Sequence, residues 1–184
     1  MDSSKPLMLH VFSTFKAGGP QVRAVQLIEA LGARYRHYIV AMDGQYDALK
    51  LFKKETSVEC FMPPDADGGL GVRLMRYRRW LKALEPHKLL TYNWGAIEMA
   101  MAARFVMGVR HIHFEDGFGP EEAEGQLARR VWFRRFALAK TEVIIVPSQT
   151  LKSIANQIWK FPDQKVQLIE NGINVQAFEQ APDL

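Results

Sequence analysis

Short runs of apolar residues alternate along this chain with longer segments in which apolar residues recur every three or four positions. Short runs rich in Val, Ile and Phe are typical of strands, and the longer period is typical of helices. Strands that alternate with helices build a parallel sheet with helices packed on it, so the pattern predicts an α/β fold with a Rossmann-like sheet. The predicted strands are residues 7–12, 38–42, 58–61, 88–92, 110–114, 142–146 and 166–169.

The predicted helices lie between these strands. Pro20 suits the first turn of the first helix, and Gly32 provides its end. Segment 70–84 keeps its apolar residues on one stripe and is otherwise rich in arginine. The predicted helices are residues 20–31, 46–54, 70–84, 96–106, 120–140 and 148–159.

The composition fits one globular domain. A chain of 184 residues, 48% hydrophobic and 24% charged, is long enough to bury one substantial core. No apolar run approaches the about 18 residues needed to cross a bilayer, and the first residues lack the features of a secretory signal, which favours a cytoplasmic protein. The lone Cys60 agrees with this location, and we expect it to pack as a small apolar residue at a strand end.

Candidate chemistry follows the strands, because open parallel sheets bind ligands at the carboxyl ends of their strands. The first such loop contains Gly18 and Gly19 and leads into a helix. Two glycines let a ligand approach the backbone, and N–H groups at a helix N-terminus attract phosphate. The same glycines could simply form a tight turn. Their spacing matches neither the GxGxxG dinucleotide fingerprint nor a P-loop.

The loop after the fifth predicted strand carries His113, Glu115 and Asp116. These residues stand at the exit of the strand, where a base or an acceptor for a sugar hydroxyl would be needed. The carboxylates could instead cap the following helix. The spacing matches no zinc signature, so we expect no metal site.

A third loop brings Asn93 and Trp94 to the same edge of the sheet. Such pairs suit sugar recognition, in which the ring covers C–H faces and the amide meets hydroxyl groups. Alternatively, Trp94 is a core residue and Asn93 caps a helix.

Several segments, taken in order, resemble the N-terminal domain of family 4 glycosyltransferases, which have the GT-B architecture of two Rossmann-like domains facing across a cleft. They are the Gly18-Gly19 helix start, the loop with His113 and Asp116, Val146-Pro147-Ser148 before a helix that ends near Trp159, and Val166-x-Leu168-Ile169-x-Asn171-Gly172-Ile173-Asn174. The resemblance covers nearly the whole chain. It implies that residues 1–174 are the acceptor-binding domain and that 175–184 begin an interdomain linker.

The resemblance also implies an activity: retaining transfer of a sugar from a nucleotide-sugar donor to a glycan or lipid-linked acceptor, without a metal ion or other cofactor. The C-terminal domain of such enzymes binds most of the nucleotide and carries a Glu-x7-Glu pair. That domain is absent from this sequence, so we expect the chain alone to be inactive.

The same resemblance assigns roles to residues. Gly18 and Gly19 would approach the donor diphosphate, and either His113 or Asp116 would face the reacting sugar. The family often has His before the glycine of that loop, whereas Asp116 precedes Gly117 here. The expected acceptor contacts are Phe15, Lys16, Asn93, Trp94 and Glu115, and the expected interdomain hinge is Asn171 and Gly172.

The net charge of +4 comes with two arginine-rich predicted helices, 70–84 and 120–140. They could rest on anionic lipid at the inner face of a membrane, or pack on two sides while their arginines reach solvent. An alternative function is a non-catalytic Rossmann-like module that binds nucleotides or polyanions. No RNA-binding motif or zinc finger supports that alternative, and we expect no nucleic acid partner.

Overall fold

The computed structural model describes residues 4–122 and 125–172. In this part of the chain, seven strands form one sheet in the order β3-β2-β1-β4-β5-β6-β7, and all neighbouring strands run parallel. The predicted Rossmann-like α/β fold is therefore confirmed. The strands are β1 (Leu7–Phe12), β2 (Arg36–Ala41), β3 (Glu59–Phe61), β4 (Lys88–Tyr92), β5 (Arg110–Phe114), β6 (Val143–Val146) and β7 (Val166–Leu168).

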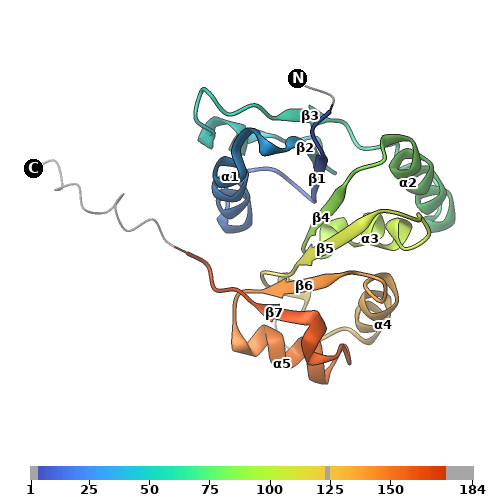
Figure 1. Ribbon diagram of the computed structural model, residues 1–184. Helices are drawn as coiled ribbons and strands as arrows, with labels where there is room; N and C mark the ends of the chain where they lie inside the picture. Colours follow the sequence, from blue (N-terminus) through green and yellow to red (C-terminus); the bar gives the residue numbers. More distant parts are fainter. Residues whose placement is uncertain (1–3, 123–124, 173–184) are drawn as a thin grey trace, which may run out of the picture.

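Helices connect the strands and cover both faces of the sheet (Figure 1). The α-helices are α1 (Gly19–Leu31), α2 (Leu70–Leu84), α3 (Ile97–Ala103), α4 (Ala128–Ala137) and α5 (Gln149–Gln157). Short 3-10 turns are η1 (Gly32–Arg34), η2 (Asp47–Leu51), η3 (Trp94–Ala96), η4 (Pro120–Glu122) and η5 (Asp163–Lys165).

Two predicted helices are wrong in extent. Segment 46–54 forms only the turn η2, because Phe52 is already extended and so short a helix gains little from its own hydrogen bonds. Segment 120–140 is divided into η4 and α4. Gly125 lies between them with φ of 154°, a backbone conformation that side chains rarely adopt and that interrupts a helix.

The alternation of side chains along each strand builds two cores. On one face of β4, Leu90 packs with Ile28 of α1 and Ala48 of η2. On the other face, Leu89 packs with Leu81 of α2 and Met99 of α3. α4 and α5 extend this second layer over β6 and β7.

The order of the strands reverses between β1 and β4, which are neighbours although β2 and β3 lie between them in sequence. Such a switch point is where open α/β sheets bind ligands. The loops after these two strands touch, since a Cβ atom on Gly95 would lie 2.0 Å from the Cβ of Ser13. Only glycine fits there, so the loops after β1 and β4 form one continuous edge.

Two further observations concern the surface. Cys60 is exposed on the short edge strand β3, so the expectation that it packs as a small apolar residue is wrong. Within residues 4–122 and 125–172, every helix is too short or too polar to cross a bilayer.

Candidate functional site

Arg23 of α1 joins three segments at the carboxyl edge of the sheet. Its Nη2 atom lies 2.5 Å from Oδ1 of Asp116, which follows β5. Its Nη1 atom donates to Oδ1 of Asn171, beyond β7, at 2.5 Å. Its guanidinium carbon lies 5.3 Å from the centre of the Phe114 ring. One side chain therefore brings together two residues that the sequence singled out from separate motifs.

Asn93 fixes the backbone next to this ion pair. Its side-chain Oδ1 accepts a hydrogen bond from the backbone N–H of Asp116 at 2.7 Å, and its own N–H donates to the carbonyl of Phe114 at 2.8 Å. Asn93 adopts φ of 57°, in the left-handed range that asparagine tolerates better than most residues. It stands at the N-cap position of η3, but its side chain makes no capping hydrogen bond, because Oδ1 is bonded to Asp116.

The Asp116 side chain is 11% exposed, but both of its carboxylate oxygens are buried, and among the described residues neither has a hydrogen-bond partner. Burial raises the pKa of Asp116 above its usual value, and the nearby Arg23 guanidinium opposes the rise. A carboxylate so placed can accept a hydrogen bond from a hydroxyl group of a ligand while Arg23 partly neutralises its charge.

A hollow of about 380 Å³ opens beside this cluster. The residues that line it include Arg23, Tyr92, Phe114, Ile169 and Gly172. Its walls are mainly apolar with a few polar groups, which is the usual character of small-ligand sites. The predicted hinge residue Gly172 thus borders the hollow.

The start of α1 is open on the same edge of the sheet. Gly18 is the N-cap and supplies no side-chain hydrogen bond to the helix, and a Cβ atom on Gly19 would meet nothing within 4 Å. Lys16 is exposed in the same loop. The first N–H groups of a helix have no partner within it, so this end can receive an anion.

His113 and Glu115, by contrast, are fully buried. Nδ1 of His113 bonds Oγ1 of Thr91 at 2.8 Å, and Nε2 lies 3.7 Å from Oε2 of Glu115. Glu115 in turn contacts Nε of Arg134 at 3.3 Å. Both side chains lie beneath the edge of the sheet, and the catalytic role of His113 and the acceptor contact of Glu115 stay predictions. Asp116 lies nearer the surface, with its side chain 11% exposed.

Two further residues predicted to contact the acceptor differ in burial. The Phe15 side chain is fully buried, with its ring centre 4.9 Å from that of Phe12, and its acceptor contact stays a prediction. Trp94 is half-buried between Arg130, whose guanidinium carbon lies 4.6 Å from the ring centre, and Phe133. One part of this ring remains open to a ligand.

Sequence reasoning missed Arg23. Its position on α1 gave no signal, because arginine on the outer side of a helix is usually solvated. The only available hint was its place in the first turns of a helix that opens at the ligand-binding edge. The predicted residues Ile173 and Asn174 lie outside the described residues. Among those described, no three His, Cys, Asp or Glu side chains come close enough together to hold a metal ion.

The switch point, the open helix start and the acidic residue beyond β5 define a Rossmann-like domain with a ligand site at the carboxyl edge of its sheet. Residues 17–177 match the sequence model of Glycosyltransferase Family 4. Since the match covers most of the chain, the chain belongs to that family, and the predicted resemblance to its N-terminal domain is confirmed. The comparison with curated protein sequences gave no match.

Solved structures share the fold at low sequence identity. Anabaena Alr3699/HepE, solved in complex with UDP and glucose, has a TM-score of 0.72 and 15% identity, over 96% of this chain and 47% of that one. A glycosyltransferase from Rickettsia africae ESF-5 has a TM-score of 0.65 and 13% identity, over 95% and 45% of the two chains. Acinetobacter baumannii MurG has a TM-score of 0.55 and 12% identity, over 96% and 50%. This chain therefore spans about half the length of these relatives.

Proposed function

We propose that this domain is the acceptor-binding half of a retaining glycosyltransferase. It would act with a second domain to transfer a sugar from a nucleotide-sugar donor to a glycan or lipid-linked acceptor. The proposal includes no metal cofactor, a cytoplasmic location and contact with a membrane surface. Membership of glycosyltransferase family 4 and the UDP and glucose bound to HepE support the class of donor.

The observation that carries the proposal is the contact between Arg23, Asp116 and Asn171. Asp116 is the acid nearest the switch-point edge, held by Asn93 on its backbone and by Arg23 on its carboxylate, and among the described residues both of its carboxylate oxygens lack a hydrogen-bond partner. In this position it can accept a hydrogen bond from a hydroxyl of the transferred sugar. The open N-terminus of α1 can stabilise the negative charge that develops on a departing diphosphate.

Replacing Asp116 by asparagine in the two-domain enzyme is expected to lower kcat/KM about 10- to 100-fold, the effect of losing one hydrogen bond to a charged group. Asparagine keeps the shape and the contact of the backbone N–H with Asn93. Steady-state transfer of a radiolabelled sugar measures the change. Asp43→Asn, at an exposed carboxylate beyond β2, is the control and should leave kcat/KM unchanged. A larger loss in His113→Gln than in Asp116→Asn, at unchanged Tm, would return the catalytic role to His113.

Replacing Gly19 by leucine should raise the KM for the nucleotide sugar about tenfold or more, because a side chain at the helix start blocks the approach of the diphosphate. The fold should tolerate the change, since a Cβ atom at Gly19 meets nothing within 4 Å. Gly71→Leu is the matched control: Gly71 also stands in the first turn of a helix, α2, with open space around its Cβ position. Equal donor KM values for both variants would remove the diphosphate role from Gly19.

A further inference from the structure

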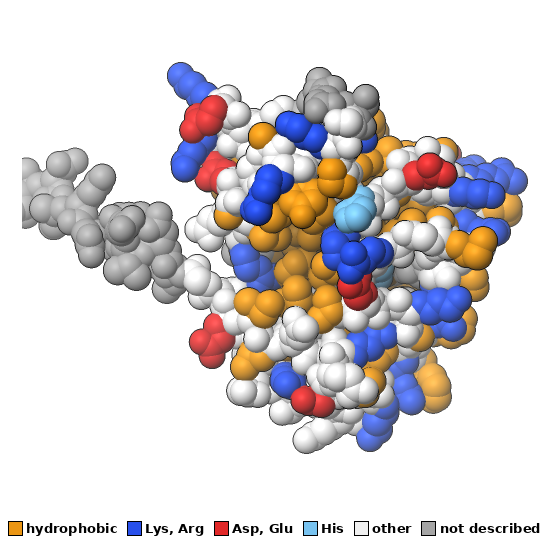
Figure 2. Space-filling view, in the orientation of Figure 1, with side chains coloured by type: hydrophobic (Ala, Val, Ile, Leu, Met, Phe, Trp, Pro, Cys, Tyr) orange, Lys and Arg blue, Asp and Glu red, His pale blue; other side chains and the backbone are white. Residues whose placement is uncertain are grey.

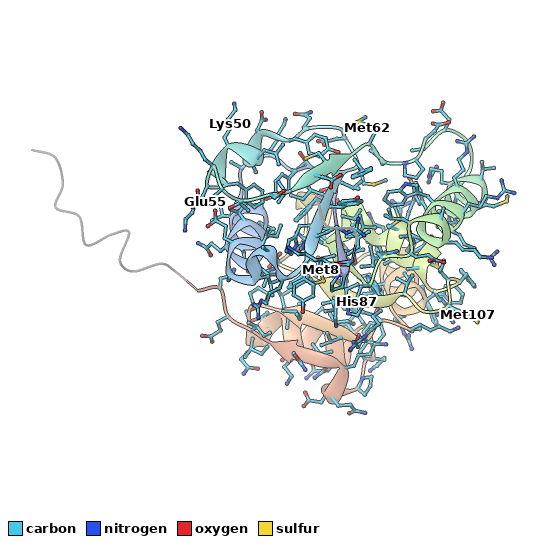
Figure 3. All side chains as sticks on the ribbon, turned by 45° about the horizontal axis from the view of Figure 1, so that its top comes forward. Met8, Lys50, Glu55, Met62, His87 and Met107 are labelled. Atoms are coloured by element: carbon cyan, nitrogen blue, oxygen red, sulfur yellow. The ribbon has the colours of Figure 1, made fainter. Side chains whose placement is uncertain are left out.

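One surface of the domain combines exposed apolar side chains with cations that lack carboxylate partners. It lies where α2, α3 and α4 end, and we call it the basic apolar surface. Its apolar members are Met75, Phe105, Met107, Trp132 and Phe136, and its cations are Arg78, Lys82, Arg104, Arg135 and Lys140. Met107 is 98% exposed and Trp132 is 66% exposed. In Figure 3, Met107 stands at the outer margin of the molecule, beyond the helices.

Contacts between these residues show that the surface is continuous. Nη1 of Arg104 donates to the carbonyl of Phe136 at 2.5 Å, and its guanidinium carbon lies 4.0 Å from the centre of the Phe136 ring. Nε of Arg78 donates to the carbonyl of Phe105 at 3.1 Å. The turn after α3 is thus tied to α4 on one side and to α2 on the other, and cations alternate with rings across it.

Two hollows flank the tip of this turn. One, of about 560 Å³, runs between Met75, Ala137 and Lys140, and the other, of about 510 Å³, between Lys82 and Pro86. Phe105 and Met107 border both. The two side chains therefore form a ridge with a hollow on either side. Figure 2 shows hydrophobic and basic side chains mixed along the right-hand margin of the molecule.

The electrostatic balance of this surface is strongly positive. Among the described residues, none of its five cations forms an ion pair with a carboxylate. One carboxylate, Glu85, borders the hollow beside Lys82. The nearby Glu142 is already paired with Arg110 and Lys88. The surface thus has cationic groups available for an external anion.

We propose that the basic apolar surface binds an anionic lipid bilayer, with Met107 and Phe105 inserted among the headgroups and the cations on lipid phosphates. Moving the exposed Met107 side chain out of water into an apolar environment is favourable. The long basic side chains around it can reach lipid phosphates while their apolar stems stay among the apolar groups. A polyanion in solution would use the cations and leave the apolar ridge in water. The proposed function includes contact with a membrane, and this inference rests on it by assigning that contact to the basic apolar surface.

The position of the surface agrees with such docking. Met107 precedes β5, whereas Asp116 follows it, so the ridge lies toward the amino ends of the strands and the candidate site toward their carboxyl ends. A bilayer bound at the ridge leaves the Asp116 edge open to a sugar donor. Tyr77 of α2 is not part of the surface, because its side chain is buried in the core.

Sedimentation with large vesicles tests the proposal on the 184-residue chain. The chain should bind vesicles that contain phosphatidylglycerol and phosphatidylcholine, and bind much less to phosphatidylcholine alone. Met107→Ser should weaken binding about five- to tenfold, the effect of one apolar side chain that no longer leaves water. Lys82→Glu with Lys140→Glu should weaken it about tenfold or more. Within the described part of the chain, neither lysine makes a hydrogen bond to another residue, and the Met107 side chain is exposed to solvent. The Tm of these variants should therefore equal that of the parent chain.

Met62→Ser is the matched control, since Met62 is a methionine that is 71% exposed but lies beyond β3, away from this surface (Figure 3). Its vesicle binding should equal that of the parent chain. Equal losses for Met62→Ser and Met107→Ser overturn the proposed location. Binding that depends on the lysines but not on Met107, and that polyphosphate matches, identifies a polyanion site and overturns the proposal, as does absence of vesicle binding. Sugar transfer is not measured, so these outcomes bear on the membrane contact and leave the proposed sugar transfer standing.

Discussion

Replacing Arg134 by methionine should lower the free energy of unfolding by about 3–5 kcal/mol, the cost of removing one partner from a buried ion pair. The Arg134 side chain is fully buried. Its Nη1 and Nη2 atoms bind the two carboxylate oxygens of Glu122 at 3.0 and 2.8 Å, and Nε lies 3.3 Å from Glu115. Methionine fills a similar volume but leaves the buried Glu115 carboxylate without its arginine and leaves Glu122 with Arg130 alone. Chemical denaturation followed by circular dichroism measures the loss.

The aromatic residues around Arg134 add to the expected cost. The guanidinium carbon lies 4.8 Å from the centre of the Trp94 ring, 5.2 Å from Phe118 and 5.1 Å from Trp159. Arg129→Met is the control, because Arg129 is exposed on the same helix, and it should change stability by less than about 0.5 kcal/mol. In a Glu122→Gln background, Arg134→Met should cost less than in the parent chain. Equal costs in both backgrounds would show that the two side chains are not coupled.

Acid should destabilise the domain strongly between about pH 6.5 and pH 4. On the other face of the sheet, Nε2 of His10 bonds Nδ1 of His37 at 3.1 Å, and Nδ1 of His10 bonds the Tyr92 hydroxyl at 3.0 Å. Burial and the neighbouring His37 lower the pKa of His10 to about 3, and burial lowers the pKa of His37 to about 4. In this pH range His10 and His37 bind protons in the unfolded chain but not in the folded chain.

The direction follows from that difference. A histidine whose pKa is lowered by folding contributes its full stability above its unfolded pKa of about 6.5 and loses it as the pH falls toward the folded pKa. The free energy of unfolding should drop by about 1.4 kcal/mol per pH unit for each such histidine. His37→Asn keeps a nitrogen near the position of Nδ1 and should make the slope shallower by about that amount.

Urea denaturation at several pH values measures this slope. The control is His87→Asn, because His87 is exposed, and its replacement should leave the slope as it is in the parent chain. A slope that stays unchanged in His37→Asn would assign the acid sensitivity to other groups, His111 first among them. Burial also lowers the pKa of His111, with a contribution from His113.

Much of the fold could be predicted from the sequence, because the spacing of apolar residues and the residues that begin or end helices indicate the same elements. The stripe of apolar residues fixed the limits of α2 to the residue, and Ser148 caps α5, accepting a hydrogen bond from the N–H of Leu151. Predictions failed where structure depends on distant partners or on a single backbone angle. Gly125 divides the predicted helix 120–140, and an apolar period cannot reveal φ at one glycine.

The sequence predicted which loops form the candidate site, but not which of their side chains face solvent. Strand order places the residues after β1, β4 and β5 at one edge, so Gly19, Asn93 and Asp116 could be named. Which of His113, Glu115 and Asp116 faces solvent depends on the buried Arg134, and the arginines of that helix were expected to reach solvent. Charge pairs between segments that lie far apart in sequence leave no periodic signal, and Arg23 was missed for the same reason.

The two hydrogen bonds of Asn93 have a mechanical consequence. Asn93 donates its N–H to the carbonyl of Phe114 and accepts a hydrogen bond from the N–H of Asp116. These two bonds continue the hydrogen-bond pattern between β4 and β5 by one residue, with the side-chain carbonyl of Asn93 in the place of its peptide carbonyl. The backbone of Asp116 is therefore held as rigidly as the sheet, although it lies beyond the last residue of β5. Asp116 is positioned as a strand residue would be, which is the kind of support that holds a reactive group in place before a substrate arrives.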